Sequence, residues 1–458
     1  MPPPIALSLC ILFIFSVFVI DFKRRPEVSS ALWIPLIWLM IMASRPVAQW
    51  IYPGQGESVA GFEEGNPIDR AILSILIVSG VFVLLRRRIY WGQILKGNSW
   101  LVLFFVYCGV SIFWSDFPAV AFKRWIRAIG SLMMVLVVLS ESDPVEAIKT
   151  LIRRCAYVLI PVSILLIKYY WHLGVAHEFW TGKAMFAGVT TDKNALGRLC
   201  LVCGMFFLWN IVTTWGKKTK SVDKKGMLVD GIFLLMILLL LIKSGSATSV
   251  GSFIAGWVVF MGLGLPVMKR SVRYLGIFIM LGIFILGALE LSVNLTEMVV
   301  KSLGRDMTLT ERTYIWTDLL SMGTDPLFGT GYDTFWLGRR LETIWIRYPG
   351  LNEAHSGYLE AYLEVGVVGL VLLTGLLISS YRKIRRSLIL NFDYGRVGFT
   401  VLVSFLLYNV TEAAYKATGL MFFVLLLIGV DMPLQSRSLT QGAGKDLLLP
   451  TNRIFDEP

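Results

Sequence analysis

The sequence predicts an all-α, polytopic transmembrane bundle of about 12–13 helices. Of its 458 residues, 56% are hydrophobic and only 16% are charged, and the mean hydropathy is +0.68. Soluble domains carry roughly a quarter charged residues. Apolar runs of about the length that crosses a bilayer recur along most of the chain. These observations indicate one membrane-embedded bundle instead of several soluble domains.

Thirteen apolar runs are candidate membrane spans. They lie at residues 4–20, 31–44, 71–85, 99–114, 125–140, 152–168, 194–214, 228–242, 248–267, 274–290, 358–380, 397–413 and 417–432. The first run lacks a basic leader and a small-residue cleavage site, so we expect a retained helix and no signal peptide.

Clusters of lysine and arginine predict the orientation of the bundle. They occupy alternate connections, at residues 23–25, 86–88, 153–154, 217–225, 269–273 and 382–386. Cytoplasmic loops are rich in these residues, so all six clusters are expected on the cytoplasmic side. The N-terminus is then outside and the polar tail inside. The net charge of +12 is therefore explained by the basic cytoplasmic loops, and no nucleic-acid partner is expected.

Four segments follow from this pattern. We expect an N-terminal transmembrane bundle at 1–290, a large outer loop with short helices at 291–357, C-terminal transmembrane helices at 358–433, and a disordered cytoplasmic tail at 434–458. A loop of this length without repeats is more often functional than a simple connection.

The outer loop contains two patterned stretches. Thr308 and Glu311 have the spacing of a capping box before a short amphipathic helix in "TLTERTYIWTDLL", on which Arg312, Trp316 and Leu319 share one face. In "DPLFGTGYDTFW", the two glycines at 329 and 331 permit a tight turn against a close neighbour. The first stretch brings a cation toward the bilayer.

Several cations run against the predicted orientation because they face outward. Charge in or near a membrane is costly and usually functional, so these residues are candidates for binding an anion. The helix N-terminus that begins with Lys193 would favour an anion as well. The outward cations are Lys123, Arg124 and Arg127 at the start of the fifth span, Arg198 in the seventh, Lys243 after the eighth, and several arginines between 301 and 347. Guanidinium groups bind phosphate oxygens bidentately, so such a cluster suits a lipid-linked pyrophosphate.

His355 is the candidate general base of the outer loop. It precedes the span that begins near 358, where it would line up with Leu359 and Tyr362 at helical spacing. The alternative interpretation is an interfacial histidine that anchors the helix end. The other two histidines, at 172 and 177, lie in the aromatic stretch "YYWHLGVAHEFW" and are interpreted as structural.

Acidic residues near the same end need partners. Glu364 would lie about two turns into the membrane beside Glu360, and we expect an outward-facing arginine to pair with it. Glu412 and Lys416, near the outer ends of the last two spans, are interpreted as a pair that orients the cations.

The sequence predicts neither a metal site nor a cofactor. It contains no convincing set of spaced ligands and no phosphate-binding glycine loop. All five cysteines fall in apolar segments, so disulfides are not expected, and the pair at 200 and 203 is interpreted as small hydrophobic residues. The small residues of "IKSGSATSVGS" form either a tight turn or part of a substrate-lining surface.

The stretch "GRDMTLTERTYIWTDLLSMGTDPLFGTGYDTFW", followed by "NEAHSGYLEAYLEVGVVGL", resembles the O-antigen ligase and polymerase family of bacterial envelope glycosyltransferases. Within that family the chain looks most like the exopolysaccharide polymerisation proteins. "SIFWSDFP", "TDKNALG" and "SGSATS" resemble weaker signatures of the family.

The resemblance implies a metal-independent enzyme of the bacterial inner membrane with its active site on the periplasmic side. Its donor would be an undecaprenyl-pyrophosphate-linked oligosaccharide. His355 matches the catalytic histidine of the family, and Arg312 matches the arginine that contacts the donor pyrophosphate. A second arginine of many ligases has no counterpart in "KSGSATS", and we expect Lys243 or Arg198 to replace it, with Arg124 or Arg127 as further contacts.

The function expected from the sequence is the polymerisation of lipid-linked repeat units into a surface polysaccharide. Two alternatives stay open: an O-antigen ligase that transfers the glycan to lipid A core or another acceptor, and a transporter or flippase. The expected partners are the lipid-linked oligosaccharide and membrane lipid. A chain-length regulator and a flippase of the same pathway are further candidates.

Overall fold

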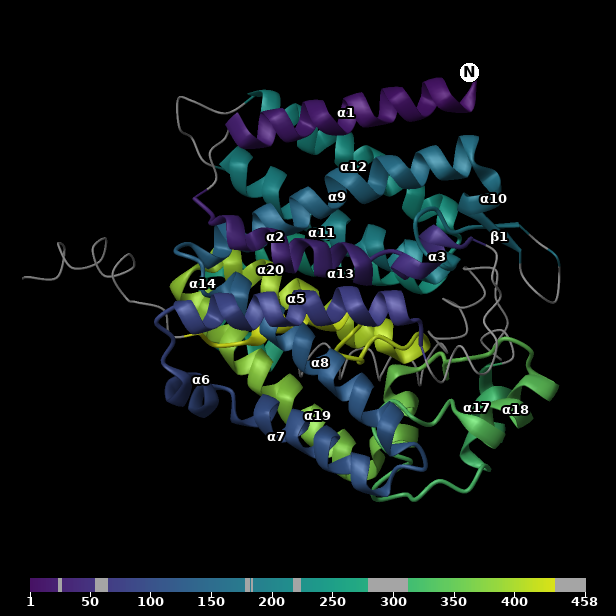
Figure 1. The fold of residues 1–458 in the computed structure, drawn as a ribbon. Coiled ribbons are helices and arrows are strands. Elements are labelled where there is room, and N and C mark those ends of the chain that lie inside the picture. Colours follow the sequence, from purple (N-terminus) through teal and green to yellow (C-terminus); the bar gives the residue numbers. More distant parts are fainter. Residues whose placement is uncertain are drawn as a thin grey trace, which may run out of the picture.

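The computed structural model describes residues 1–23, 27–53, 65–177, 182, 184–216, 224–278 and 312–432. This part of the chain is a bundle of long helices with two short strands at one end (Figure 1). The prediction of an all-α membrane bundle is confirmed. Its elements are α1 (Pro3–Lys23), η1 (Ser30–Leu32), α2 (Trp33–Met42), α3 (Val47–Ile51), α5 (Pro67–Arg86), α6 (Trp91–Gly97), α7 (Ser99–Val110), η2 (Ser111–Trp114), α8 (Pro118–Leu139), α9 (Pro144–Tyr169), α10 (Trp171–Gly174), β1 (Val175–His177), β2 (Ala184–Phe186), α11 (Lys193–Gly216), α12 (Lys224–Ser244), α13 (Ala247–Leu263), α14 (Pro266–Arg270), η3 (Val272–Tyr274), α17 (Arg312–Leu320), α18 (Gly338–Arg347), α19 (Gly357–Leu390), α20 (Phe392–Thr411) and α21 (Leu420–Gly429).

Six of the described helices are long and apolar enough to cross a membrane. They are α1, α5, α9, α11, α12 and α19, and α6 with α7 and η2 forms a further apolar pair that is bent by 90°. Shorter apolar helices include α13 and α21. Twelve of the thirteen expected spans coincide with described helices, whereas most of the span at 274–290 lies outside the described residues.

Local sequence explains where several helices begin. The side chain of Asp143 accepts hydrogen bonds from the first turn of α9, which also has proline as its first residue. Ser246, Ser356 and Asn391 cap α13, α19 and α20 in the same way. Polar capping side chains satisfy the free N–H groups of a first turn. The small-residue stretch near 245 is therefore the predicted turn between two helices, with Gly245 at φ 65°.

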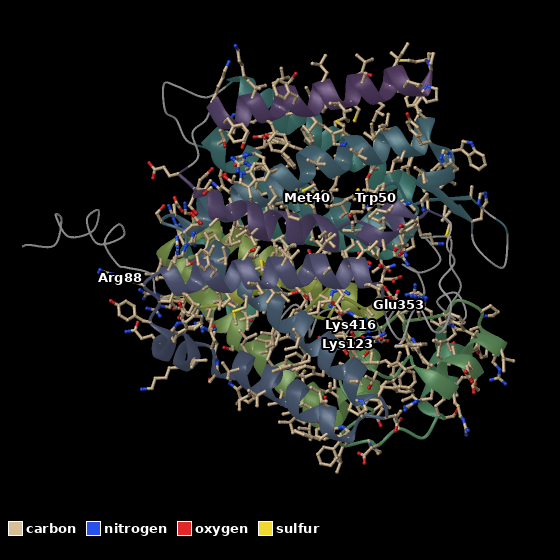
Figure 2. All side chains as sticks on the ribbon, viewed as in Figure 1. Met40, Trp50, Arg88, Lys123, Glu353 and Lys416 are labelled. Carbon is tan, nitrogen blue, oxygen red and sulfur yellow. The ribbon has the colours of Figure 1, made fainter. Side chains whose placement is uncertain are left out.

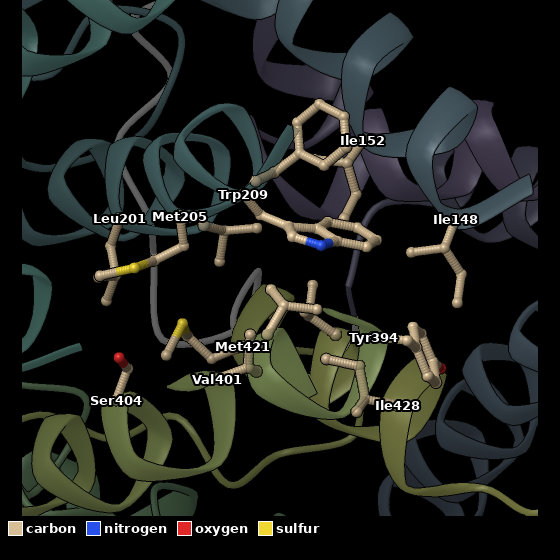
Figure 3. A pocket seen from close by; sticks show the side chains of 14 residues that line it. Ile148, Ile152, Leu201, Met205, Trp209, Tyr394, Val401, Ser404, Met421 and Ile428 are labelled. Carbon is tan, nitrogen blue, oxygen red and sulfur yellow. The ribbon is translucent and has the colours of Figure 1, made fainter. Parts of the chain in front are cut away.

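Long-range packing brings together helices that are distant in the sequence. α1 packs on α9, α7 packs on α19, and α13 packs on α20, while α11 contacts both α12 and α13. A single large apolar cluster joins these helices. Its interior keeps a small apolar cavity of about 30 Å³ between α9, α11, α20 and α21, where the indole of Trp209 faces Met421 and Val401 (Figure 3).

The bundle has two distinct ends. α3, α10, β1, α17 and α18 lie at one of them, here called the site end, and α6 and α14 lie at the other (Figure 1). Figure 2 shows Arg88 at the far end, and Lys123, Lys416 and Glu353 close together and away from it, on the side of the site end. The arginines at 86–88 and the candidate site thus lie at opposite ends, as the charge pattern predicts.

One part of the charge prediction is wrong. Arg153 and Arg154, assigned to a loop from sequence, lie inside α9 and are both buried. Their Nε groups donate to the two carboxylate oxygens of Asp21 at 2.7 and 2.8 Å. Asp21 on α1 is fully buried. A buried charge needs such pairing, and this trio joins α1 to α9 instead of reporting the position of a loop.

Two short helices make a small separate core at the site end. Leu319 of α17, Leu341 and Ile344 of α18, and the pair Phe335 and Trp336 pack together. The predicted amphipathic helix is confirmed, because Arg312 and Leu319 on its inner face are both buried. Thr308 and Glu311 of the predicted capping box lie outside the described residues.

Helix α19 is interrupted at Gly366, which has φ 64°. The segment 326–331 packs into the break: Val367 donates its backbone N–H to the carbonyl of Pro326 at 3.0 Å, and Gly331 donates to the carbonyl of Glu364 at 2.8 Å. A Cβ on Gly366 would lie 2.2 Å from the carbonyl oxygen of Leu327. The predicted tight turn against a close neighbour is confirmed, and that neighbour is the broken helix.

Candidate functional site

His355 lies in a short connection before α19 and not on the helix itself. Its backbone has φ 49°, a left-handed conformation that is uncommon for a residue other than glycine. Both peptide groups of the preceding residue are held in place: the indole of Trp316 donates to the carbonyl of Ala354 at 2.7 Å, and the Ala354 N–H donates to Glu360 at 2.8 Å. The expected helical alignment of His355 with Leu359 is therefore wrong, and surrounding bonds fix the imidazole instead.

Glu412 joins the two residues that the sequence singled out. Its Oε1 accepts from Nη2 of Arg312 at 2.7 Å and from Nδ2 of Asn194 at 2.9 Å. Its Oε2 lies 3.4 Å from Nδ1 of His355. Arg312 also donates to the carbonyl of Thr411, at the end of α20. One buried carboxylate thus collects side chains from α11, α17 and the connection before α19.

A second carboxylate faces the same imidazole nitrogen. Oε1 of Glu353 lies 3.1 Å from Nδ1 of His355. The other nitrogen, Nε2, forms no hydrogen bond within the described chain. About a quarter of the His355 side chain, 26%, is exposed, compared with 3% for Glu412. The imidazole is therefore anchored through Nδ1 and presents Nε2 for chemistry.

These contacts decide the protonation of the site. Burial lowers the pKa of His355, but the hydrogen bonds and negative charges of Glu353 and Glu412 outweigh burial and raise the pKa to about 10. Burial raises the pKa of Glu412, but the bonds and charges of His355 and Arg312 outweigh it, so the pKa is lowered. In the absence of substrate the site is an imidazolium and a guanidinium around a shared carboxylate.

Lys416 is the centre of a second cluster, four residues further along the same loop. Its ammonium lies 2.8 Å from Asp333, 3.2 Å from Glu360 and 3.1 Å from Glu364. Tyr415 donates its hydroxyl to Glu364. A partly buried cation with three carboxylates ties α19 to the loop that carries Glu412.

Asp333 links this cluster to α8. Its carbonyl accepts from Nη1 of Arg124 at 2.5 Å, and its carboxylate lies 3.5 Å from the same nitrogen. Burial raises the pKa of Asp333, but the charges of Lys416 and Arg124 outweigh it and lower the pKa. Asp333 also has a left-handed backbone, with φ 56°. The guanidinium of Arg124 is therefore already bound to Asp333.

The structure brings some of the other predicted cations near the site and leaves others apart. Arg198 donates to the carbonyl of Ala413 at 3.4 Å and lies 5.9 Å from the ring of Tyr408, next to Glu412 in the chain fold. Lys193 is the first residue of α11. Arg127 forms no ion pair with any described residue, although the charges of Asp333 and Asp69 act on it. Lys243 is exposed and lies 5.4 Å from the ring of Phe186.

Two pairings inferred from the sequence are wrong. Glu364 is paired with Lys416 and not with an arginine, because the broken helix turns it toward the 412–419 loop. Glu412 and Lys416 do not form a pair: the first neutralises Arg312, and the second neutralises the cluster around Glu364. The expectation that Glu412 contacts the cations is confirmed for Arg312.

Glu353 and Asp333 are site residues that the sequence reasoning missed. Glu353 stands two positions before His355 in "NEAHSG", where the short spacing to a candidate base was the available signal. Asp333 had only its place after two turn glycines in "GTGYD". Neither of these sequence features predicts which residue the carboxylate pairs with.

Three donors among the described residues lie close enough together to hold a metal ion. They belong to Glu353, His355 and Glu412, within 4.8 Å of one another. The guanidinium of Arg312 already lies on the same carboxylate at 2.7 Å. A divalent ion there would face this positive charge, which disfavours a metal at this position.

The described chain is a multi-pass α-helical membrane protein that carries a partly buried arginine, glutamate and histidine constellation at one end of its bundle. Residues 232–374, which include Arg312 and His355, match the O-antigen ligase family. Over 291 residues the chain is 26% identical to the exopolysaccharide production protein ExoQ of Rhizobium meliloti (strain 1021), covering 62% of this chain and 64% of that protein, which is less than two thirds of its length. The chain is thus similar to the O-antigen ligase family over this stretch and to an exopolysaccharide production protein over a longer part of its length.

Proposed function

We propose that this protein is a glycosyltransferase that joins lipid-pyrophosphate-linked oligosaccharide units into a surface polysaccharide. The site end of the bundle faces the periplasm, and the far end, with its arginines at 86–88, faces the cytoplasm. The observation that carries the proposal is the meeting of Arg312 and His355 on Glu412. The likeness to an exopolysaccharide production protein supports the same substrate class.

Arg312 would bind the diphosphate of the donor. A guanidinium donates two parallel hydrogen bonds to phosphate oxygens, and Arg312 presents one nitrogen to Glu412 and another to a carbonyl. The incoming diphosphate replaces Glu412 on this arginine. Arg198, close to the same loop, is the second cation. Together they stabilise the negative charge that develops on the leaving diphosphate.

His355 would take the proton of the acceptor. The acceptor hydroxyl oxygen attacks the anomeric carbon of the donor sugar, the bond from that carbon to the diphosphate oxygen breaks, and Nε2 receives the hydroxyl proton. Glu353 and Glu412 hold Nδ1, which keeps Nε2 directed at the substrate. Because the pKa of His355 is about 10, only a small fraction of the sites is ready at neutral pH, and this fraction grows as the pH rises.

The decisive experiment replaces His355 by alanine. Purified protein is given a defined undecaprenyl-pyrophosphate oligosaccharide in the presence of a chelator, and the products are analysed by mass. The wild-type protein should extend the glycan and release undecaprenyl pyrophosphate, whereas the variant should leave the donor intact. Arg88→Ala is the matched control, since Arg88 is an exposed cation at the far end of the bundle. Polymer of normal length from the histidine variant would refute the assignment.

The family description favours a second candidate, ligation of a finished glycan to another acceptor. Both reactions use the same donor diphosphate and the same base. Cells that lack the protein separate them: unpolymerised single repeats at the surface indicate a polymerase, and accumulated lipid-linked polymer indicates a ligase.

The break in α19 favours transport as a third candidate, because interrupted helices with buried charge are typical of transporters. Transport moves the donor without altering it. Elongated glycan made by detergent-solubilised protein, where no membrane separates two compartments, would exclude transport as the sole activity.

A further inference from the structure

A groove of about 310 Å³ opens on the side of the bundle between α2, α3 and α9. Its walls are apolar side chains such as Ile37 and Met40 of α2, and Val158 and Val162 of α9. None of the groove residues belongs to the constellation around Glu412. This groove is therefore a separate feature of the bundle.

Arg45 is the one charged residue in the groove lining. Its Nη2 donates to the carbonyls of Leu173, Gly188 and Thr190, each at 2.8 Å, and its Nε donates to Val189. Nη1 forms no hydrogen bond within the described part of the chain. The bonds that Arg45 does make hold its side chain at the groove with one N–H₂ group left available.

No described carboxylate neutralises this guanidinium. Burial alone lowers the pKa of Arg45, and no acidic side chain acts against it. The arginine nevertheless stays protonated, because a guanidinium gives up its proton only in strongly basic solution. A half-buried cation that bonds only to neutral carbonyls attracts an anion.

The groove lining follows α2 from Ile37, passes Ser44 and continues at Arg45 and Trp50. Figure 2 shows Met40 near the middle of the bundle and Trp50 toward the site end. The guanidinium of Arg45 lies 4.8 Å from the ring of Trp50. An apolar slot that ends in a cation and a tryptophan has the polarity of one lipid molecule, with its chain in the membrane interior and its head group at the interface.

We propose that this groove binds an anionic phospholipid, with one acyl chain between α2 and α9 and the phosphate on Nη1 of Arg45. A phosphodiester carries a single negative charge, which one guanidinium can neutralise. A diphosphate needs more than one cation and finds them beside Arg312 instead. The proposal does not depend on the reaction that the protein performs.

The test measures lipid retention by native mass spectrometry. Wild-type protein is delipidated in detergent and titrated with phosphatidylglycerol, and one molecule per chain should bind. Arg45→Gln should weaken this binding roughly tenfold, because a charge-assisted hydrogen bond is lost. Val162→Trp, which fills the groove and leaves Arg45 in place, should abolish it.

The controls separate the groove from general effects. Arg88→Gln removes a cation at the far end, and Val78→Trp enlarges a side chain that is 69% exposed on α5, so both should bind like the wild type. Unchanged phosphatidylglycerol binding by Val162→Trp would overturn the groove assignment. Equal competition by diacylglycerol would overturn the phosphate contact. Preferential displacement by undecaprenyl phosphate would replace the proposed occupant with the lipid carrier of the substrate.

Discussion

Replacing Glu412 by glutamine should lower the pKa of His355 substantially. Glutamine keeps an oxygen that can accept from Arg312 and Asn194, so the geometry survives while one negative charge is removed. Of the two carboxylates on Nδ1, Glu353 remains at 3.1 Å. The substitution therefore isolates the electrostatic contribution of Glu412.

The size of the effect follows from the pKa of His355. A rise from 6.5 to about 10 corresponds to roughly 5 kcal/mol in favour of the imidazolium. Two carboxylates at similar distances supply it against the opposing effect of burial, so the loss of one should remove at least half of the rise in the pKa. The neutral fraction at pH 7 then increases, and the pH at which transfer activity levels off moves down by the same amount.

The assay is an NMR titration of protein labelled at histidine. The chain contains only three histidines, and His355→Asn identifies the signal of interest. Glu342→Gln is the matched control because Glu342 is an exposed acid on α18. If the His355 signal of the Glu412→Gln variant still titrated near pH 10, Glu412 would not be the group that holds the proton there.

Four further predictions follow. Lys416→Met leaves two buried carboxylates and the partly buried Asp333 without their cation and should lower the free energy of unfolding by about 3–5 kcal/mol, measured by denaturation in detergent; an unchanged value would contradict the second cluster. Gly366→Ala should lower the free energy of unfolding by about 1–3 kcal/mol, because a Cβ at this position would meet the carbonyl of Leu327. A wild-type melting temperature of this variant would argue against the break in α19. Arg312→Lys keeps the charge but loses the bidentate geometry, so the KM for the donor should rise roughly tenfold with a smaller change in kcat. Because the folded-state pKa of His355 is raised, its stabilisation is complete below pH 6.5 and lost as the pH rises through about 10; His355→Asn should flatten this part of the melting curve against pH.

Local composition was enough to predict the helices. In a bilayer a single long apolar run can form all of its backbone hydrogen bonds only as a helix. Capping residues such as Asp143 and Ser356 mark where a helix begins. The two main candidate site residues, Arg312 and His355, could also be predicted, because a cation and an imidazole next to apolar spans are exceptional. Both could be identified as candidates without knowing which residues surround them in the fold.

Misassignments occurred where a local signal had a distant cause. Arg153 and Arg154 resemble a cytoplasmic cluster, yet both form ion pairs with the carboxylate of Asp21 on α1, more than 130 residues away in the chain. Glu364 required a cation, but the type of cation depended on how the chain turns after α20. Sequence spacing identifies a charge that needs a partner without identifying the partner.

The sequence by itself determined that this chain forms a membrane bundle and singled out His355 and Arg312 as candidates for its chemistry, since both conclusions depend on the polarity of short segments. The tertiary structure alone decided that the two residues meet on Glu412 and that α19 breaks at Gly366. It also decided that Arg45 lines an apolar groove. These features arise from contacts between helices far apart in the chain, and such contacts depend on how whole helices pack and not on any one segment.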